Sequence, residues 1–159
     1  MGKVIELSNY KKVGVNVTIF DVADTFLSMS KLTNKQLQKL CYYAQAWYVT
    51  VNNEPLFEDE IQAWIHGPVC PELYHKYKSN GYLPIQMSQV PKVIADDSYV
   101  YDFIKSIFNE YGKLSGDELE ILSHNEDPWR KARKNCEDWE PSYEVITTSS
   151  MKEYYSSLV

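Results

Sequence analysis

The sequence has few cysteines, no long apolar run and none of the short motifs that mark common active sites. Its three cysteines, Cys41, Cys70 and Cys136, form no CxxC pair, which argues against a disulfide framework or a cysteine-based zinc site. No apolar run approaches the roughly 18 residues of a membrane span, and the opening MGKVIEL lacks a signal-peptide core. The P-loop, GxSxG, HExxH and GxGxxG patterns are absent. We therefore expect a cytoplasmic protein that is not an enzyme and has neither cofactor nor metal.

Basic residues are also in the minority. The 159 residues include 22 acidic and 16 basic side chains, for a formal net charge of −6. This balance disfavours broad binding to a phosphate backbone and would suit a basic protein partner, although solubility alone also explains it. Apolar residues make up 44% of the chain, enough for one globular domain. The 13 tyrosines are expected to be half-buried or to lie at an interface.

Apolar residues recur at helical spacing along most of the chain. Residues that favour helix starts precede several of these segments; they are Thr18, Thr33, Ser115, Asp127 and Ser150. The expected helices cover about 18–27, 33–51, 71–79, 97–111, 115–124, 127–136 and 150–158. The fold class is therefore mainly α, a compact single-domain bundle of six or seven helices at 18–159, with room for a short β-hairpin. Residues 1–17 are expected to form an N-terminal arm.

The stretch from Leu56 to Pro71 breaks the helical pattern. Phe57, Ile61, Ala63 and Ile65 alternate, so a short strand and a single helical turn both remain open. Gly67-Pro68 then interrupts the chain, and such a rigid break is either a packing corner or a binding surface. A second interruption, residues 82–96, is expected to be a loop with at most a brief strand pair.

Three groups of residues could carry chemistry, and each also has a simpler explanation. Cys70 lies at a helix start, where a thiol pKa can fall, so a thiol hydrolase is one hypothesis. His124, Glu126 and Asp127 cluster at a helix end and could bind a metal ion. The simpler interpretation is that they cap the two helices that meet there. Two basic clusters make a DNA-binding autoregulator an alternative, although a solvated helix face is the simpler interpretation. One is Arg130, Lys131, Arg133 and Lys134; the other is the line of Lys31, Lys35 and Lys39, which begins just before the 33–51 helix. In that helix Lys35, Gln38, Lys39 and Gln45 are expected on the outer face.

Three motifs in order resemble one protein family. Residues 37–48, LQKLCYYAQAWY, are similar to the family signature LQKLLYYAQGWYL, with Cys41 and Ala46 as conservative departures. Residues 56–74 resemble LFxDxIxAWxxGPVxPxLY, and residues 122–133 resemble LSHxExPWxxAR. On these motifs the chain is identified as a member of the SocA-like antitoxins, or Panacea domain, often found as phage-associated proteins. The resemblance extends from about residue 18 to 132.

This resemblance implies an antitoxin that neutralises a cognate protein toxin by direct binding, or acts as a proteolytic adaptor for a ClpXP-type protease. Trp47 and Trp129 are expected in the core. The candidate partner-binding residues are Trp64, His66, Pro68, Glu72, Tyr74, Asp127 and Arg130. Toxin choice could depend on residues 1–17 or 82–96. The sequence determines neither the toxin nor the oligomeric state.

Overall fold

The computed structural model describes residues 16–159, which contain eight α-helices and one two-stranded antiparallel sheet. The predicted arm at 1–17 therefore lies outside the described residues except for its last two. The mainly α fold class is confirmed. The elements are α2 (Ile19–Met29), α3 (Asn34–Asn52), β1 (Gln62–Trp64), β2 (Gly67–Val69), α4 (Pro71–Tyr77), a 3₁₀ turn η2 (Lys78–Asn80), α5 (Lys92–Ala95), α6 (Ser98–Tyr111), α7 (Gly116–His124), α8 (Asp127–Ala132) and α9 (Thr148–Ser156).

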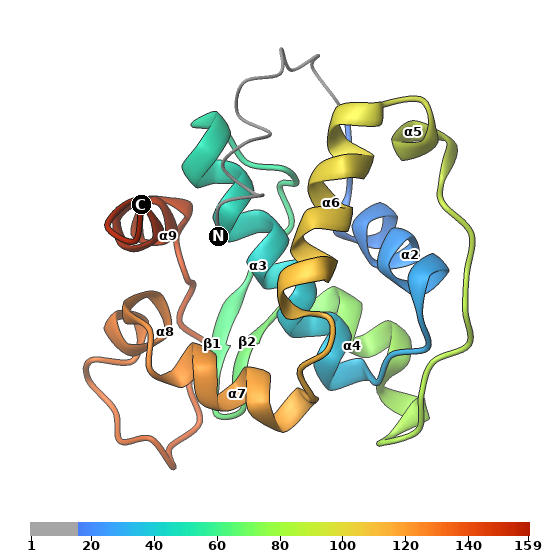
Figure 1. Ribbon diagram of the computed structural model, residues 1–159. Helices are drawn as coiled ribbons and strands as arrows, with labels where there is room; N and C mark the ends of the chain where they lie inside the picture. Colours follow the sequence, from blue (N-terminus) through green and yellow to red (C-terminus); the bar gives the residue numbers. More distant parts are fainter. Residues whose placement is uncertain (1–15) are drawn as a thin grey trace.

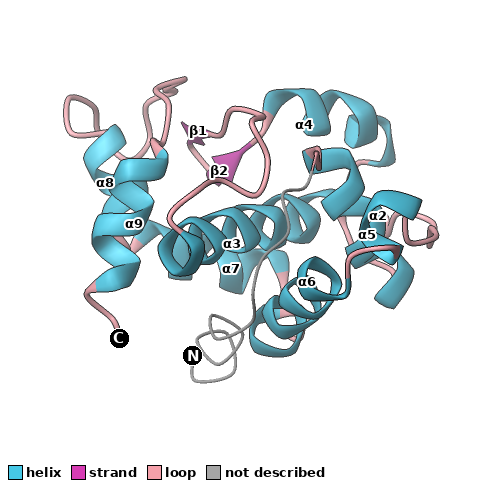
Figure 2. Ribbon diagram, turned by 90° about the horizontal axis from the view of Figure 1, so that it is seen from above, coloured by secondary structure: helices cyan, strands magenta, loops and turns pink. Residues whose placement is uncertain are grey.

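The long helix α3 forms the centre of the fold. Figures 1 and 2 show α2, α5 and α6 on one side of α3, α8 and α9 on the other, and α7 across one end. The hairpin β1–β2 lies against α3 between these two groups. Because every side of α3 has a neighbour, most of its residues are buried, including Trp47, as predicted.

The extensive burial of α3 contradicts one expectation from the sequence. Gln38, Lys39 and Gln45 were expected on the outer face, yet all three are buried. Gln45 accepts from the backbone N–H of Leu56 at 2.8 Å and donates to the Phe57 carbonyl at 2.7 Å. Polar side chains are buried here because irregular segments next to α3 present backbone groups that need partners. Hydrophobic periodicity cannot reveal such pairing.

Helix starts were predicted with mixed success. Thr18, Thr33 and Ser115 each cap a helix as predicted, and each forms a capping box, in which a side chain three residues later bonds back to the cap. Two other predictions were wrong by a few residues. Asp127 is the first residue of α8 rather than its cap, and α9 is capped by Thr147 instead of Ser150.

The predicted loop at 82–96 contains an eighth helix. Pro91 precedes the single turn of α5, which is too short to produce an apolar period. The brief strand pair is reduced to one bridge, in which the Ile85 N–H donates to the Leu32 carbonyl at 2.7 Å. Downstream, α8 ends at Ala132, so Cys136 lies beyond the helix to which the sequence had assigned it.

A buried carboxyl group joins α9 to α3. The hydroxyls of Tyr43 and Tyr155 donate to Glu126 at 2.6 and 2.9 Å, and Tyr42 contacts Tyr155 at 3.1 Å. Burial raises the pKa of Glu126 despite these two hydrogen bonds. Glu126 therefore binds neighbouring tyrosines and does not form the helix cap expected from the sequence, since α8 has no side-chain cap bond.

Candidate protein-binding surface

The segment 61–70, for which the sequence allowed either a short strand or a single helical turn, forms a β-hairpin. Trp64 pairs with Gly67, so Ile65 and His66 form the turn. Gly67 has φ +108°, a conformation that residues with a Cβ rarely adopt. A Cβ at this position would also lie 2.7 Å from Cε of Lys39. Glycine is therefore required both by the turn and by the close approach of α3.

Beneath the hairpin lies Lys39, whose side chain is 1% exposed. Its Nζ donates to the Pro68 carbonyl at 3.2 Å. Burial, with a smaller contribution from Lys35, lowers the pKa of Lys39 to about 7. The predicted basic line of Lys31, Lys35 and Lys39 is therefore wrong as a surface feature, because its last member is internal.

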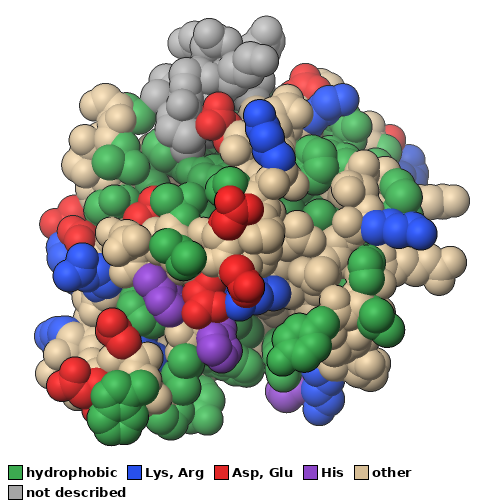
Figure 3. Space-filling model, turned by 60° about the horizontal axis from the view of Figure 1, so that its bottom comes forward, with side chains coloured by type: hydrophobic (Ala, Val, Ile, Leu, Met, Phe, Trp, Pro, Cys, Tyr) green, Lys and Arg blue, Asp and Glu red, His purple; other side chains and the backbone are tan. Residues whose placement is uncertain are grey.

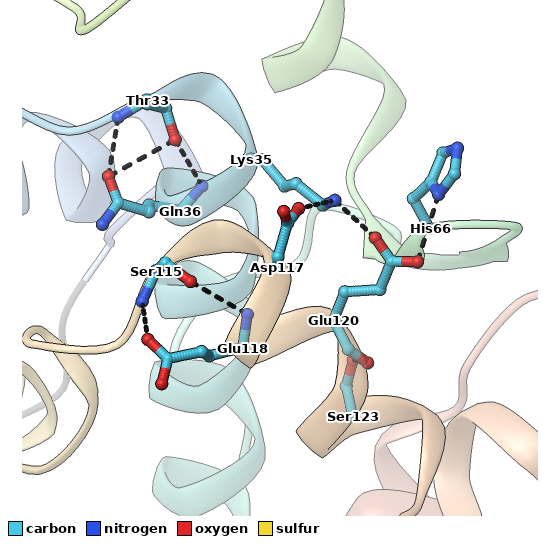
Figure 4. Close-up of polar contacts among 9 residues, drawn as sticks. All are labelled: Thr33, Lys35, Gln36, His66, Ser115, Asp117, Glu118, Glu120 and Ser123. Carbon is cyan, nitrogen blue, oxygen red and sulfur yellow. Dashed lines mark hydrogen bonds and ion pairs between the residues drawn. The ribbon is translucent and has the colours of Figure 1, made fainter. Parts of the chain in front are cut away.

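A series of ion pairs lies beside the turn of the hairpin and joins it to α7 and α3 (Figure 4). Lys35 pairs with Asp117 at 2.7 Å and also with Glu120, whose other oxygen lies 3.2 Å from Nδ1 of His66. Burial opposes the charge on Glu120, but bonds from Lys35 and His66 outweigh it and lower the pKa of this carboxyl group. Figure 3 shows acidic and histidine side chains gathered on this face of the molecule. These ion pairs fix the turn of the hairpin to α7 and α3.

Strand β1 of the hairpin is held by α8 and the segment that follows it. Trp129 is buried, as predicted, and its Nε1 donates to the Trp64 carbonyl at 2.8 Å. Arg133 is 3% exposed; its Nη1 donates to the Ala63 carbonyl at 2.9 Å, and its Nη2 to the Glu137 carbonyl at 2.9 Å. The basic cluster at 130–134 is therefore interrupted, because Arg133 is a structural residue. Lys131 is 3.9 Å from Asp127, which further reduces the free charge.

A third segment extends the sheet. The Ala63 N–H donates to the Glu144 carbonyl and the Ile146 N–H donates to the Ile61 carbonyl, both at 2.8 Å, so Val145 lies beside Gln62. Side chains on a strand alternate between faces. Ala63 accordingly points into the core, whereas Gln62 and Trp64 are half-buried on the outer face.

Three aromatic rings meet on that outer face. The Trp64 ring centroid lies 5.1 Å from that of Tyr74 and 6.1 Å from that of Tyr143, both in edge-to-face geometry. Tyr143 is 69% exposed and Tyr74 36%. Trp64 is also oriented by a bond from its Nε1 to Gln62, which in turn donates to Glu60 at 2.9 Å. We name the outer-face residues Gln62, Trp64, Tyr74, Tyr143 and Val145 the aromatic face.

The predicted site residues divide into three groups. Trp64 and Tyr74 lie together on the aromatic face, and Glu72 is exposed two residues from Tyr74. His66 is exposed at the hairpin turn, whereas Asp127 and Arg130 lie on α8. Pro68 is buried, so its expected exposure is wrong; its carbonyl is the partner of a buried lysine.

Sequence reasoning missed Tyr143 on the exposed face and Arg133 as an internal support. Tyr143 lies outside every helical pattern and outside the three motifs. The only signal for Arg133 was its place at the end of the third motif.

Cys70 does not have the environment of a nucleophile. It is buried, and Gln38 bonds to both its N–H and its carbonyl, at 2.9 and 3.2 Å. Burial raises the pKa of the Cys70 thiol, outweighing the backbone N–H groups at the start of α4. Within residues 16–159, no group of three or more histidine, cysteine or acidic side chains is placed to hold a metal ion. In that range no helix is long and apolar enough to cross a membrane.

The fold and this surface define a small, mainly helical domain with an exposed aromatic sheet face and no recognised catalytic constellation among its described residues. The family model described as "Antitoxin SocA-like, Panacea domain" matches residues 37–130, more than half of the sequence, and the chain belongs to this family. "Antitoxin SocA" of Caulobacter vibrioides (strain NA1000 / CB15N) is 28% identical over 109 residues. The alignment covers 62% of this chain and 58% of that relative, so the chain spans less than two thirds of its length. No solved structure matches the chain.

Proposed function

We propose that this protein is an antitoxin that neutralises a cognate protein toxin by binding it directly. The observation that carries the proposal is the family match over 37–130, which includes most of α3, the hairpin and α7. The relative that bears the name antitoxin aligns over 109 residues.

The aromatic face supports direct binding as the mode of action. Tryptophan and tyrosine are enriched among the few interface residues that contribute most of the binding energy. Here two such rings are exposed beside a half-buried tryptophan, on a sheet fixed from behind by Trp129, Arg133 and Lys39. A surface that is already ordered loses little conformational entropy when a partner binds.

Co-expression with the product of the adjacent open reading frame tests the proposal. We expect that product to arrest growth when expressed alone, and this chain to restore growth and to co-purify with it. A neighbour without toxicity, or a toxic neighbour that this chain neither binds nor neutralises, would contradict the antitoxin function.

The same assay in a host without ClpXP separates direct binding from delivery to a protease. Direct neutralisation predicts that growth is restored equally in both hosts, with the toxin still present in the cell. Restoration that needs the protease and removes the toxin would instead assign an adaptor role.

A further inference from the structure

The aromatic face continues into a groove along one edge of the sheet. The groove has a volume of about 320 Å³ and lies between the segments 55–61 and 145–151, with Gln45 of α3 among its lining residues. Val145 belongs to both features, and Glu60 lines the groove while accepting a bond from Gln62 on the aromatic face. The volume is at the low end of ligand pockets, which span roughly 300–1,000 Å³, and suits one or two side chains.

The segments that form this combined surface are acidic. Segments 55–64, 71–75 and 143–148 contain five carboxylates and neither lysine nor arginine; the carboxylates are Glu58, Asp59, Glu60, Glu72 and Glu144. All except Asp59 are exposed, and Asp59 accepts a bond from the Ile19 N–H at 2.9 Å.

Nearby cations are engaged elsewhere. Lys152, one residue from the groove residue Met151, donates to Asn53. Lys76 of α4 lies over the Phe20 ring, 5.3 Å from its centroid. Neither amine is bonded to a carboxylate of the groove.

We propose that the aromatic face and the adjoining acidic groove together bind a basic segment of the partner toxin, one that presents arginine or lysine side chains. This inference rests on the proposed function. The guanidinium of an arginine stacks on tryptophan and tyrosine rings and pairs with carboxylates, so a single basic segment satisfies both halves of the surface. Carboxylates on three separate segments attract such a partner before contact, and the rings provide the desolvated anchor after it.

Binding of purified variants to the immobilised product of the adjacent open reading frame tests this assignment. The double charge reversal Glu58→Lys with Glu60→Lys, at two exposed residues that line the groove, should slow association and weaken affinity by about tenfold or more. Tyr143→Ala should mainly speed dissociation. For the wild type, affinity should fall between about 50 and about 300 mM salt, and this dependence should shrink in the double variant.

Two variants act as matched controls away from this surface. Leu158→Ala shortens an apolar side chain that is 50% exposed beyond the end of α9, and Asp102→Lys reverses an exposed charge on α6. Both should bind as the wild type does, and circular dichroism should show that every variant is folded.

The possible outcomes separate this inference from the proposed function. If the wild type neutralises the toxin while the Glu58/Glu60 and Tyr143 variants bind unchanged, the surface assignment is overturned and the antitoxin function stands. Equal losses in the control variants, or a wild-type dimer that Tyr143→Ala dissociates, would also overturn the assignment. If the wild type fails to bind the toxin at all, both proposals fall.

Discussion

The buried amine of Lys39 gives the most quantitative prediction. In the unfolded chain this amine has a pKa near 10.5, and in the folded protein burial lowers it to about 7. Between these two values the unfolded chain binds a proton that the folded protein does not bind. The free energy of unfolding must therefore rise with pH across this window.

The magnitude follows from the two pKa values. Linkage gives the wild type a gain of about 3 kcal/mol in the free energy of unfolding between about pH 7 and about pH 9.5. Lys39→Met removes the titrating group and keeps a long stem beneath Gly67. It also leaves the Pro68 carbonyl without its amine partner, which costs about 1–3 kcal/mol. At pH 7 the depressed pKa of Lys39 costs the wild type about 4 kcal/mol in total. Subtracting the lost bond, Lys39→Met should be more stable than the wild type at pH 7 by about 2 kcal/mol.

Urea unfolding of both proteins at the two pH values measures this effect. Because other titrating groups are common to both chains, they cancel in the difference between them. Lys105→Met, at an exposed lysine of α6, should show the same pH dependence as the wild type. A difference between wild type and Lys39→Met that stays constant with pH would refute the reasoning.

Three further predictions concern the supports of the hairpin and the thiols. Gly67→Ala should lower the melting temperature by about 4–8 °C in a thermal scan, because it forces a Cβ into a positive-φ position against a lysine stem. Arg133→Met should cost about 2–4 kcal/mol in urea unfolding, because buried carbonyl groups lose their donor. Lys134→Met, the exposed neighbour, should cost less than about 0.5 kcal/mol. A thiol reagent should label Cys136 in the native protein, whereas Cys70 should react only after unfolding.

Each of these has an outcome that would contradict it. A Gly67→Ala protein as stable as the wild type would mean that the turn does not need glycine. Equal effects of the Arg133 and Lys134 substitutions would mean that the buried guanidinium is not a support. Rapid labelling of Cys70 in the folded protein would reopen a chemical role for that thiol.

Local patterns in the sequence were sufficient for the longer helices. Thr18, Thr33 and Ser115 cap their helices as predicted because a capping box involves only residues within one turn. The apolar stripe of α3, with Trp47 inside, was likewise readable from its 3.6-residue period. The hairpin could be predicted only as one of two alternatives. The alternation of apolar residues and the Gly67-Pro68 break were compatible with strands but did not require them.

The sequence by itself determined a mainly helical domain, its family and the position of the break at 61–70. Only the tertiary structure decided which polar residues lie inside. Lys39, Gln45 and Arg133 look like surface residues along the chain, but each is buried against backbone carbonyls contributed by a distant segment. The same holds for the aromatic face, where Tyr143 meets Trp64 across 79 positions because the last loop joins the sheet. Periodicity reports the average environment of a helix or strand, whereas hydrogen bonding between distant segments is fixed only when they pack together.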